Sequence, residues 1–186
     1  MLQMGEKTAM RFKTFYLLGA TLLFAACDSY SAQQYQSNPQ TTIALQSVAA
    51  AGRRASVSEV TLADGINPRP TCRLAGPIDI GGGGDVTTVF QQAFLAELLA
   101  ADVYRADGTP LSIVVTELDP DSVSGNWTIG VRVSSPRGVI NVRQVTKFST
   151  SFAAVSACNN TATAFNRALG ATILAVIQDP NFRTLL

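Results

Sequence analysis

Two helical patterns enclose a run of alternating segments, and this order restricts the fold more than any other feature of the chain. Residues 86–104 and 160–178 repeat apolar side chains at helical spacing, whereas residues 111–118 and 126–133 alternate as half-buried strands do. Residues 139–155 are expected to form one further long strand. Short turns between the strands favour an antiparallel meander. We therefore expect an α+β fold, a two-layer sandwich in which an antiparallel sheet of about four strands carries two helices on one face.

The first helical segment leaves two leucines unassigned. It is expected to begin after Asp85, a residue type that caps helices well. Its apolar stripe consists of Phe90, Phe94, Leu98 and Ala101. Leu95 and Leu99 lie beside that stripe, so no rotation of the helix buries every large apolar side chain. Either both sides of the helix are covered, or Leu95 and Leu99 form a patch that binds a partner.

The second helix and the strands have clearer faces. Asn160 or Thr161 is expected to cap this helix, and Asp179-Pro180 to end it. Its stripe consists of Ala162, Phe165, Leu169, Ile173 and Val176. In the 126–133 strand one face carries Trp127, Ile129, Val131 and Val133. Residues 55–62 are expected to add a weak strand, and residues 72–80 an extended segment.

The N-terminus indicates export. Arg11 and Lys13 precede the apolar run 15–24, which is too short to span a bilayer as a stable helix. We therefore expect residues 1–26 to be a signal peptide. The following Leu23-Phe24-Ala25-Ala26-Cys27 is similar to the lipobox of bacterial lipoproteins, although Phe24 replaces the usual Leu, Val or Ile. That resemblance implies acylation of Cys27, while ordinary secretion with a free or paired Cys27 is the alternative.

An acylated Cys27 defines the organisation of the mature chain. Each buried CH₂ of an acyl chain contributes about 0.8 kcal/mol, so several chains anchor a protein stably. Residues 27–54 are polar and rich in Gln and Ser, which predicts a lipidated cysteine followed by a flexible tether, with a loose helix over residues 42–51. Residues 55–186 are then a single α+β domain facing the periplasm. Asp28 is similar to the inner-membrane signal of enteric lipoproteins, a code that other bacteria do not all share, so the choice of membrane stays open.

The remaining cysteines are even in number. With Cys27 acylated, Cys72 and Cys158 are left, and an oxidising envelope compartment favours a disulfide between them. Such a bond would tie the start of the domain to its last helix. Two separate buried thiols are the alternative, because a sequence does not show which cysteines lie close together.

Composition excludes several classes of function. The chain contains no histidine, which removes Ser-His-Asp and Cys-His catalysis and every histidine-ligated metal. Its formal net charge of +1 gives no field that would attract nucleic acid. We expect no enzyme, no cofactor and no metal site.

Four local features of the sequence resemble functional sites, and each has a simpler interpretation. The Gly81–Gly84 run lacks the residues of a phosphate loop and is expected to be a hinge. Residues 119–125 lack the closing Glu of a Ca²⁺ loop and are expected to form a hairpin turn. Glu97 has no visible acid–base partner, so we expect it to reach the helix edge or to pair with an arginine of the sheet. Trp127 and Tyr104 are expected in the core or at its rim.

The order of these segments resembles a group of small envelope lipoproteins. The group includes the LPS-assembly lipoprotein, the YajG-like lipoproteins and the auxiliary lipoproteins of lipid-transport ABC systems. The resemblance rests on the lipobox, on residues 89–104 (VFQQAFLAELLAADVY), on the meander and on residues 161–169 (TATAFNRAL). It covers most of residues 72–178 and is one of architecture and patterning.

This resemblance implies a lipid-anchored, non-enzymatic accessory protein with a protein partner in the cell envelope. The alternative is an envelope module that binds a lipid or glycan between the sheet and the helices. A flat patch at Leu95 and Leu99 would favour the accessory protein. A pocket lined by Trp127 and the helix stripes would favour the binding module.

Overall fold

The computed structural model describes residues 30–73, 75–81 and 85–186, so the expected signal peptide and Cys27 lie outside the described residues. The elements are β1 (Tyr30–Ser31), α1 (Pro39–Ala50), β2 (Ala55–Leu62), β3 (Thr71–Cys72), β4 (Gly76–Asp79), α2 (Val86–Ala100), β5 (Thr109–Asp121), β6 (Asn126–Ser135), β7 (Gly138–Lys147), α3 (Ala154–Gln178) and α4 (Phe182–Leu185). Strands and helices both contribute to the core, which confirms the α+β class. Within the described residues no helix is long and apolar enough to cross a membrane.

The larger sheet has four strands in the order β2-β5-β6-β7. Strands β5, β6 and β7 form the expected antiparallel meander. Strand β2 pairs with β5 in parallel, beginning at Ala55 opposite Thr109. The sheet is therefore mixed rather than wholly antiparallel. The physical reason is that β3, β4 and α2 lie between β2 and β5 in the chain, and a crossover of that length can return the chain in the same direction.

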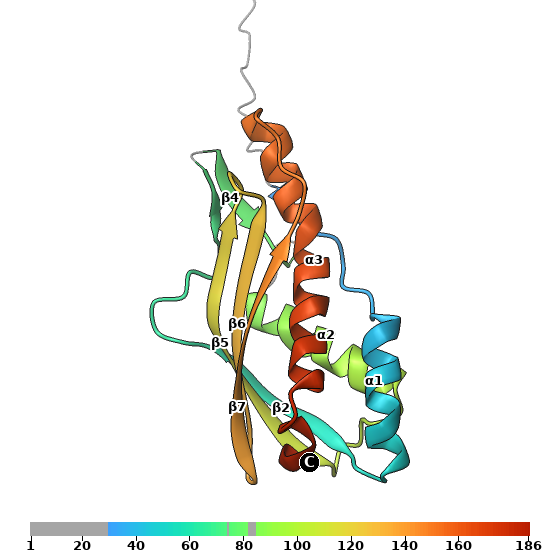
Figure 1. Cartoon of the computed structure of the whole chain (residues 1–186). Helices are drawn as coiled ribbons and strands as arrows, with labels where there is room; N and C mark the ends of the chain where they lie inside the picture. Colours follow the sequence, from blue (N-terminus) through green and yellow to red (C-terminus); the bar gives the residue numbers. More distant parts are fainter. Residues whose placement is uncertain (1–29, 74, 82–84) are drawn as a thin grey trace, which may run out of the picture.

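The core lies between this sheet and the helices (Figure 1). Helix α3 packs on β6 and β7, and α2 packs on β2. The Trp127 ring meets the Phe165 ring edge-on at a centroid distance of 5.3 Å, and its indole N–H donates a 2.8 Å hydrogen bond to the Thr161 carbonyl. The expected faces are confirmed, because Trp127, Ile129, Val131, Val133 and the whole stripe of the second helix are buried.

Two boundaries in the C-terminal half differ from expectation. Strand β7 ends at Lys147 rather than continuing to residue 155, and α3 begins at Ala154 rather than at Asn160 or Thr161. The carbonyls of Ser151 and Phe152 accept hydrogen bonds from the Arg73 guanidinium, so a side chain replaces a strand partner there. Thr161 is inside the helix, where its hydroxyl donates to the Ala157 carbonyl.

The N-terminal segment is part of the fold. Residues 27–54 were expected to begin with the lipidated cysteine and form a flexible tether, yet residues 30–54 are ordered and pack on the domain. Helix α1 begins at Asn38, whose side chain accepts from the Gln40 N–H, with Pro39 at the first helical position. Leu45 and Val48 of α1 are fully buried, and α1 packs on α3 and α2. The folded body therefore includes residues 30–54 as well as the domain expected from residue 55.

A second, smaller sheet receives the start of this segment. Its order is β1-β4-β3, with β1 parallel and β3 antiparallel to β4. The extended segment expected at 72–80 supplies β4 and part of β3. This sheet lies at the same end of the molecule as the start of α3, and the C-terminus lies at the opposite end (Figure 1).

Candidate functional site

Glu97 is the one buried acidic side chain among the described residues. Its Oε1 accepts a 2.5 Å hydrogen bond from the Tyr35 hydroxyl and a 2.7 Å hydrogen bond from the Asn38 backbone N–H. The expectation that Glu97 reaches the helix edge or pairs with an arginine is wrong. The reason is that residues 35–38 fold back over α2 and supply donors that a flexible tether would not offer.

Burial, together with the hydrogen bond to Glu97 and its charge, raises the pKa of Tyr35 far above its ordinary value. The phenol therefore stays protonated at neutral pH and keeps donating. Glu97 Oε1 thus has two donors, the protonated phenol and a backbone N–H, whereas Glu97 Oε2 is buried without a hydrogen-bond partner among the described residues. This arrangement fastens the N-terminal segment to α2.

Helix α3 holds the same segment from the other side. The side-chain amide of Asn166 donates to the carbonyls of Gln33 and Gln34, at 2.6 and 3.0 Å. The Ala32 N–H donates to the Asp79 carbonyl at 2.8 Å, which extends the β1–β4 ladder. Residues 30–38 are thus attached to α2, α3 and β4.

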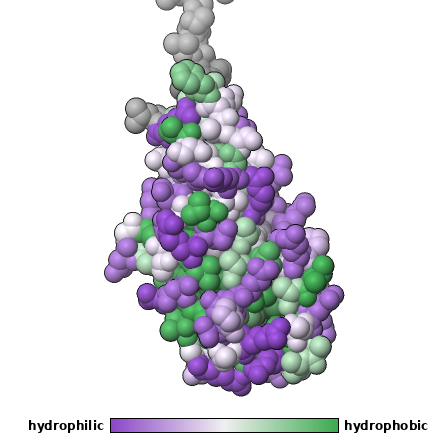
Figure 2. All heavy atoms as spheres, viewed as in Figure 1, coloured by the Kyte–Doolittle hydropathy of each residue, from purple (hydrophilic) through white to green (hydrophobic). Residues whose placement is uncertain are grey.

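A cleft of about 530 Å³ lies between this segment and α2. Gln33, Gln34 and Tyr35 line it from one side. Val89, Gln92 and Ala96 line it from α2, at the spacing of one helix face, and Ile80 and Gly81 complete it. The cleft is open and its lining is mixed, polar and apolar. Figure 2 shows polar and apolar side chains interspersed over the face that carries α3, with apolar ones gathered in the lower half of the view.

The two candidate partner-binding leucines differ in exposure. Leu99 is 55% exposed, whereas Leu95, one helical turn earlier, is only partly exposed. Leu99 continues the α2 face that lines the cleft, because it follows Ala96 by three positions. The expected stripe beside them is buried in full. The leucine patch is therefore smaller than the sequence predicts, and Leu99 dominates it.

The expected disulfide is present. Cys72 at the end of β3 and Cys158 in the first turns of α3 are joined, with their Cα atoms 5.6 Å apart and both residues fully buried. The pair links the small sheet to the last long helix. Cys27 lies outside the described residues, so its acylation stays a prediction.

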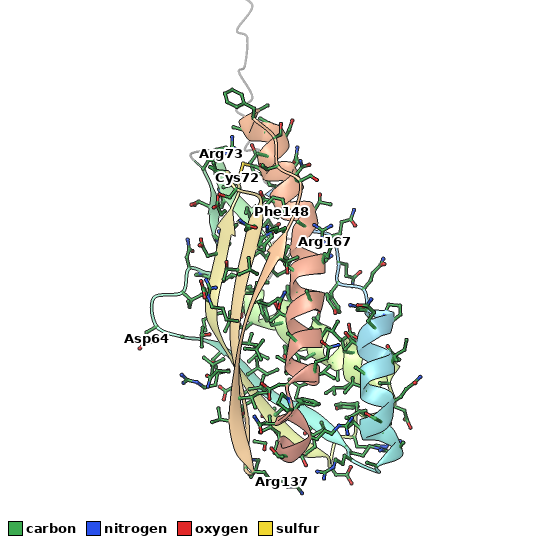
Figure 3. The ribbon with its side chains drawn as sticks, viewed as in Figure 1. Asp64, Cys72, Arg73, Arg137, Phe148 and Arg167 are labelled. Carbon is green, nitrogen blue, oxygen red and sulfur yellow. A yellow bond between two sulfur atoms is a disulfide. The ribbon has the colours of Figure 1, made fainter. Side chains whose placement is uncertain are left out.

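Arg73 organises the end of the molecule next to the disulfide, a role that no sequence pattern indicates. Its backbone has φ of 51°, a left-handed conformation that non-glycine residues rarely adopt. Its guanidinium donates to the carbonyls of Ser122, Ser151 and Phe152, at distances between 3.0 and 3.1 Å. Figure 3 labels Arg73 and Cys72 at this end. One side chain thus joins the β5–β6 turn to the segment before α3.

The β5–β6 connection is the expected hairpin turn rather than a Ca²⁺ loop. The Asp121 carboxylate accepts from the backbone N–H groups of Ser124 and Val123, and these bonds, that of Ser124 first, lower the pKa of Asp121. Gly125 has φ of 73° and its N–H donates to the Asp121 carbonyl. The carboxylate therefore caps its own turn.

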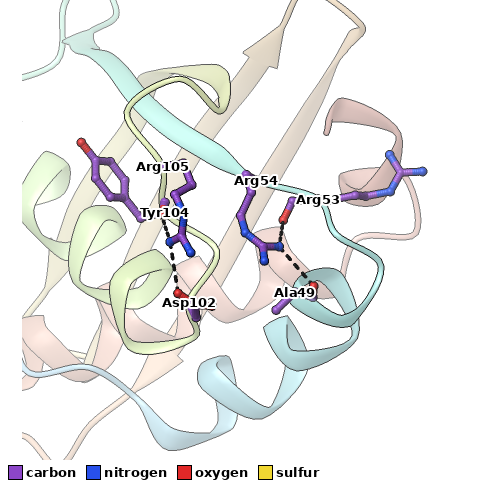
Figure 4. A network of polar contacts seen from close by, with 6 residues as sticks. All are labelled: Ala49, Arg53, Arg54, Asp102, Tyr104 and Arg105. Atoms are coloured by element: carbon purple, nitrogen blue, oxygen red, sulfur yellow. Dashed lines mark hydrogen bonds and ion pairs between the residues drawn. The ribbon is translucent and has the colours of Figure 1, made fainter.

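Several arginines at the ends of α1 and α2 bond to backbone carbonyls (Figure 4). Arg54 donates to the carbonyls of Ala49 and Arg53, and Arg105 donates to the Tyr104 carbonyl and to Asp102 Oδ1. Cationic groups at helix C-termini satisfy carbonyls that the helix leaves open. Ala49 lies in the last turn of α1, so Arg54 caps that helix, whereas Arg105 bonds within the loop that follows α2. Within the described part of the chain no three His, Cys, Asp or Glu residues gather as metal ligands would.

Comparison with known proteins gives distant likenesses only. No family model matches the chain, and no curated protein matches it. A crystal structure described as that of an uncharacterized protein is 11% identical with a TM-score of 0.45, covering 77% of this chain and 96% of that one. A Xanthomonas campestris protein of the DUF330 family is 12% identical with a TM-score of 0.47, covering 80% of this chain and 91% of that one. These likenesses assign no function to the chain.

Proposed function

We propose that the chain is a lipid-anchored, non-enzymatic accessory protein of a cell-envelope transport or assembly machine, exposed to the periplasm. The observation that carries the proposal is the division of its three cysteines. Cys72 and Cys158 are joined and buried, which suits an oxidising compartment, and this leaves Cys27 at the end of the lipobox-like sequence. The resemblance to envelope lipoproteins points the same way.

The chemistry of the described residues supports binding rather than catalysis. Glu97 bonds to Tyr35 and Asn38 through one carboxylate oxygen, and the chain has no histidine to act beside it. Leu99 is exposed on α2, where a partner protein would gain by covering it. We therefore place the partner contact on the α2 face that carries Leu99, with Leu95 at its margin.

The anchor is tested by Cys27→Ser. The variant should move from the membrane fraction to the soluble envelope fraction. Its measured mass should lack the acyl chains that the wild type carries. A C27S protein that stays membrane-bound with unchanged mobility contradicts the anchor. Globomycin, which blocks cleavage of lipoprotein signal peptides, should cause the unprocessed wild-type chain to accumulate.

The partner surface is tested by crosslinking in intact envelopes followed by purification. Leu99→Gln should lower recovery of the crosslinked partner. Val139→Gln is a matched control, because Val139 is also 55% exposed but lies on β7. Equal recovery with both variants would place the partner elsewhere.

The second candidate function is binding of a lipid or glycan, and the cleft beside α2 favours it. The ligand would not lie between sheet and helices, because Trp127, Phe165 and Phe90 fill that space. Native mass spectrometry of protein extracted from envelopes should then find a retained small molecule. Ala96→Phe, which narrows the cleft, should remove that molecule, whereas Val139→Gln should retain it.

A further inference from the structure

Tyr30, which belongs to the folded body, follows the expected lipid anchor Cys27 by three positions in the sequence. The inference below rests on acylation of Cys27, the anchor of the proposed function. Only Asp28 and Ser29 separate Cys27 from Tyr30, and three residue steps of an extended chain span at most about 11 Å. Tyr30 is buried and paired with Ile78 in β4. An anchor this short keeps the domain against the bilayer.

The direction of β1 shows which end of the domain is anchored. Because β1 runs parallel to β4, with Tyr30 opposite Ile78 and Ser31 opposite Asp79, the chain enters β1 from the end of β4 where Gly76 lies. Cys72 of β3 pairs with Gly76 at that same end. The anchored end is therefore the one that Figure 3 marks with Cys72 and Arg73. The C-terminus lies at the opposite end (Figure 1).

The anchored end carries an exposed apolar tip, which we define as Val123, Phe152 and Val155. These are three of the seven most exposed large apolar side chains among the described residues, and Phe152 is fully exposed. Leaving a phenyl ring in water is unfavourable, so its position calls for an apolar environment that covers it. The upper end of Figure 2 shows apolar as well as polar side chains.

The tip is one rigid unit assembled from separate parts of the chain. Arg73 bonds to the carbonyl of Ser122, next to Val123, and to the carbonyl of Phe152 itself. The Thr150 hydroxyl also donates to the Ser122 carbonyl. Val155 follows in the first turn of α3, which the disulfide fixes at Cys158. The three side chains are therefore held together before anything binds them.

We propose that the apolar tip inserts into the lipid surface to which Cys27 is anchored. One aromatic and two aliphatic side chains can insert at the boundary between the headgroups and the acyl chains of a bilayer. Peripheral membrane proteins insert apolar side chains at this depth. The Arg73 guanidinium keeps its charge and bonds to the carbonyls of Ser122, Ser151 and Phe152, and the proposed contact is made by the three apolar side chains. With the lipid anchor it makes a second membrane contact, which sets the domain upright and directs its C-terminal end away from the bilayer.

The test uses the full-length acylated chain reconstituted in phosphatidylcholine vesicles. Phe152→Trp places a fluorescent side chain at the tip, and Val139→Trp places one at an exposed β7 position toward the opposite end. The natural Trp127 is fully buried against Phe165, so it gives a constant background in both variants. Phe152 is fully exposed, so F152W should fold as the wild type does, which urea unfolding checks.

In vesicles of phosphatidylcholine brominated in its acyl chains, F152W should lose its added emission, whereas V139W should retain it. Acrylamide should quench V139W and spare F152W. If the protein floats with vesicles but F152W is open to acrylamide and unaffected by bromine, the inserted tip is refuted while the anchor stands; a protein partner would then cover the tip. If the chain does not float with the vesicles, the proposed anchor is wrong, and the insertion proposal is refuted together with it.

Discussion

The Tyr35 hydroxyl donates to Glu97 Oε1 across 62 positions of sequence. This hydrogen bond connects the segment after β1 to the last turn of α2. It accounts for a buried carboxylate that would otherwise be costly, since an ionised group needs hydrogen bonds when it leaves water. It also converts a stretch of tether-like composition into part of the folded body.

Removing that donor should destabilise the domain. Tyr35→Phe leaves Glu97 Oε1 with the Asn38 N–H alone, and an underbonded buried acceptor costs about 1–3 kcal/mol. Urea unfolding of the disulfide-intact protein measures the change. Gln91→Ala, at an exposed position of the same helix, should shift the free energy of unfolding by no more than about 0.5 kcal/mol. If the two variants lowered the free energy of unfolding equally, the Tyr35–Glu97 hydrogen bond would contribute nothing to stability.

The same pair predicts a pH dependence. The folded-state pKa of Tyr35 is raised above the ordinary value of 10.0, mainly by burial and then by Glu97. The stabilisation is therefore complete below about pH 10, and it declines at higher pH as the unfolded chain loses the proton more readily than the folded one. The stability gap between wild type and Y35F should therefore narrow steadily as the pH rises from about 10 to about 12. A gap that stays constant over this range would contradict the assignment.

The disulfide should carry a large share of the stability. Its two cysteines are separated by 86 positions, and crosslinks that close long loops typically contribute about 2–5 kcal/mol. Cys72→Ala with Cys158→Ala should lower the free energy of unfolding by that amount. Wild type unfolded under reducing conditions is the matched comparison. Because both cysteines are buried, native protein should also resist dithiothreitol, and rapid reduction without unfolding would argue against the observed packing.

The two leucines of α2 should respond differently to polar substitution. Leu99→Gln should change stability by about 0.5 kcal/mol or less, because the side chain is mostly in solvent. Leu95→Gln should cost more, since its side chain is partly buried. Thermal or urea unfolding of the single variants separates them. Similar large losses for both would place Leu99 in the core and remove it from the partner surface.

The spacing of apolar residues in the sequence correctly predicted the helices and strands that have one face buried in the main core. The stripes of α2 and α3 and the inward face of β6 agree with the structure because each side chain there is fixed by the helical or strand repeat. The parallel partnership of β2 was not predictable in this way. The strand alternates equally well in either direction, and only the path of β3, β4 and α2 decides it.

The N-terminal segment shows where composition misleads. Its Gln and Ser residues are typical of linkers, but Asn38-Pro39 is a helix start, and Thr41, Leu45 and Val48 share a buried face. That short stripe was the available signal. No such sequence signal exists for the roles of Tyr35, Arg73 and Phe152. Tyr35 and Arg73 act through contacts with distant parts of the chain, and the Phe152 ring is notable because nothing in the described part of the chain covers it.

The Cys72–Cys158 bond also determines how a mechanical load would cross the molecule. Tension from an N-terminal anchor enters at the two residues of β1, passes through β4 to β3, and then crosses one covalent bond into α3, a helix of 25 residues. The four-stranded sheet lies outside this path. Under a pull the short β1–β4 ladder would give way first, and the bonds of Asn166 and Glu97 to residues 33–38 would follow, while the meander and α3 stayed folded.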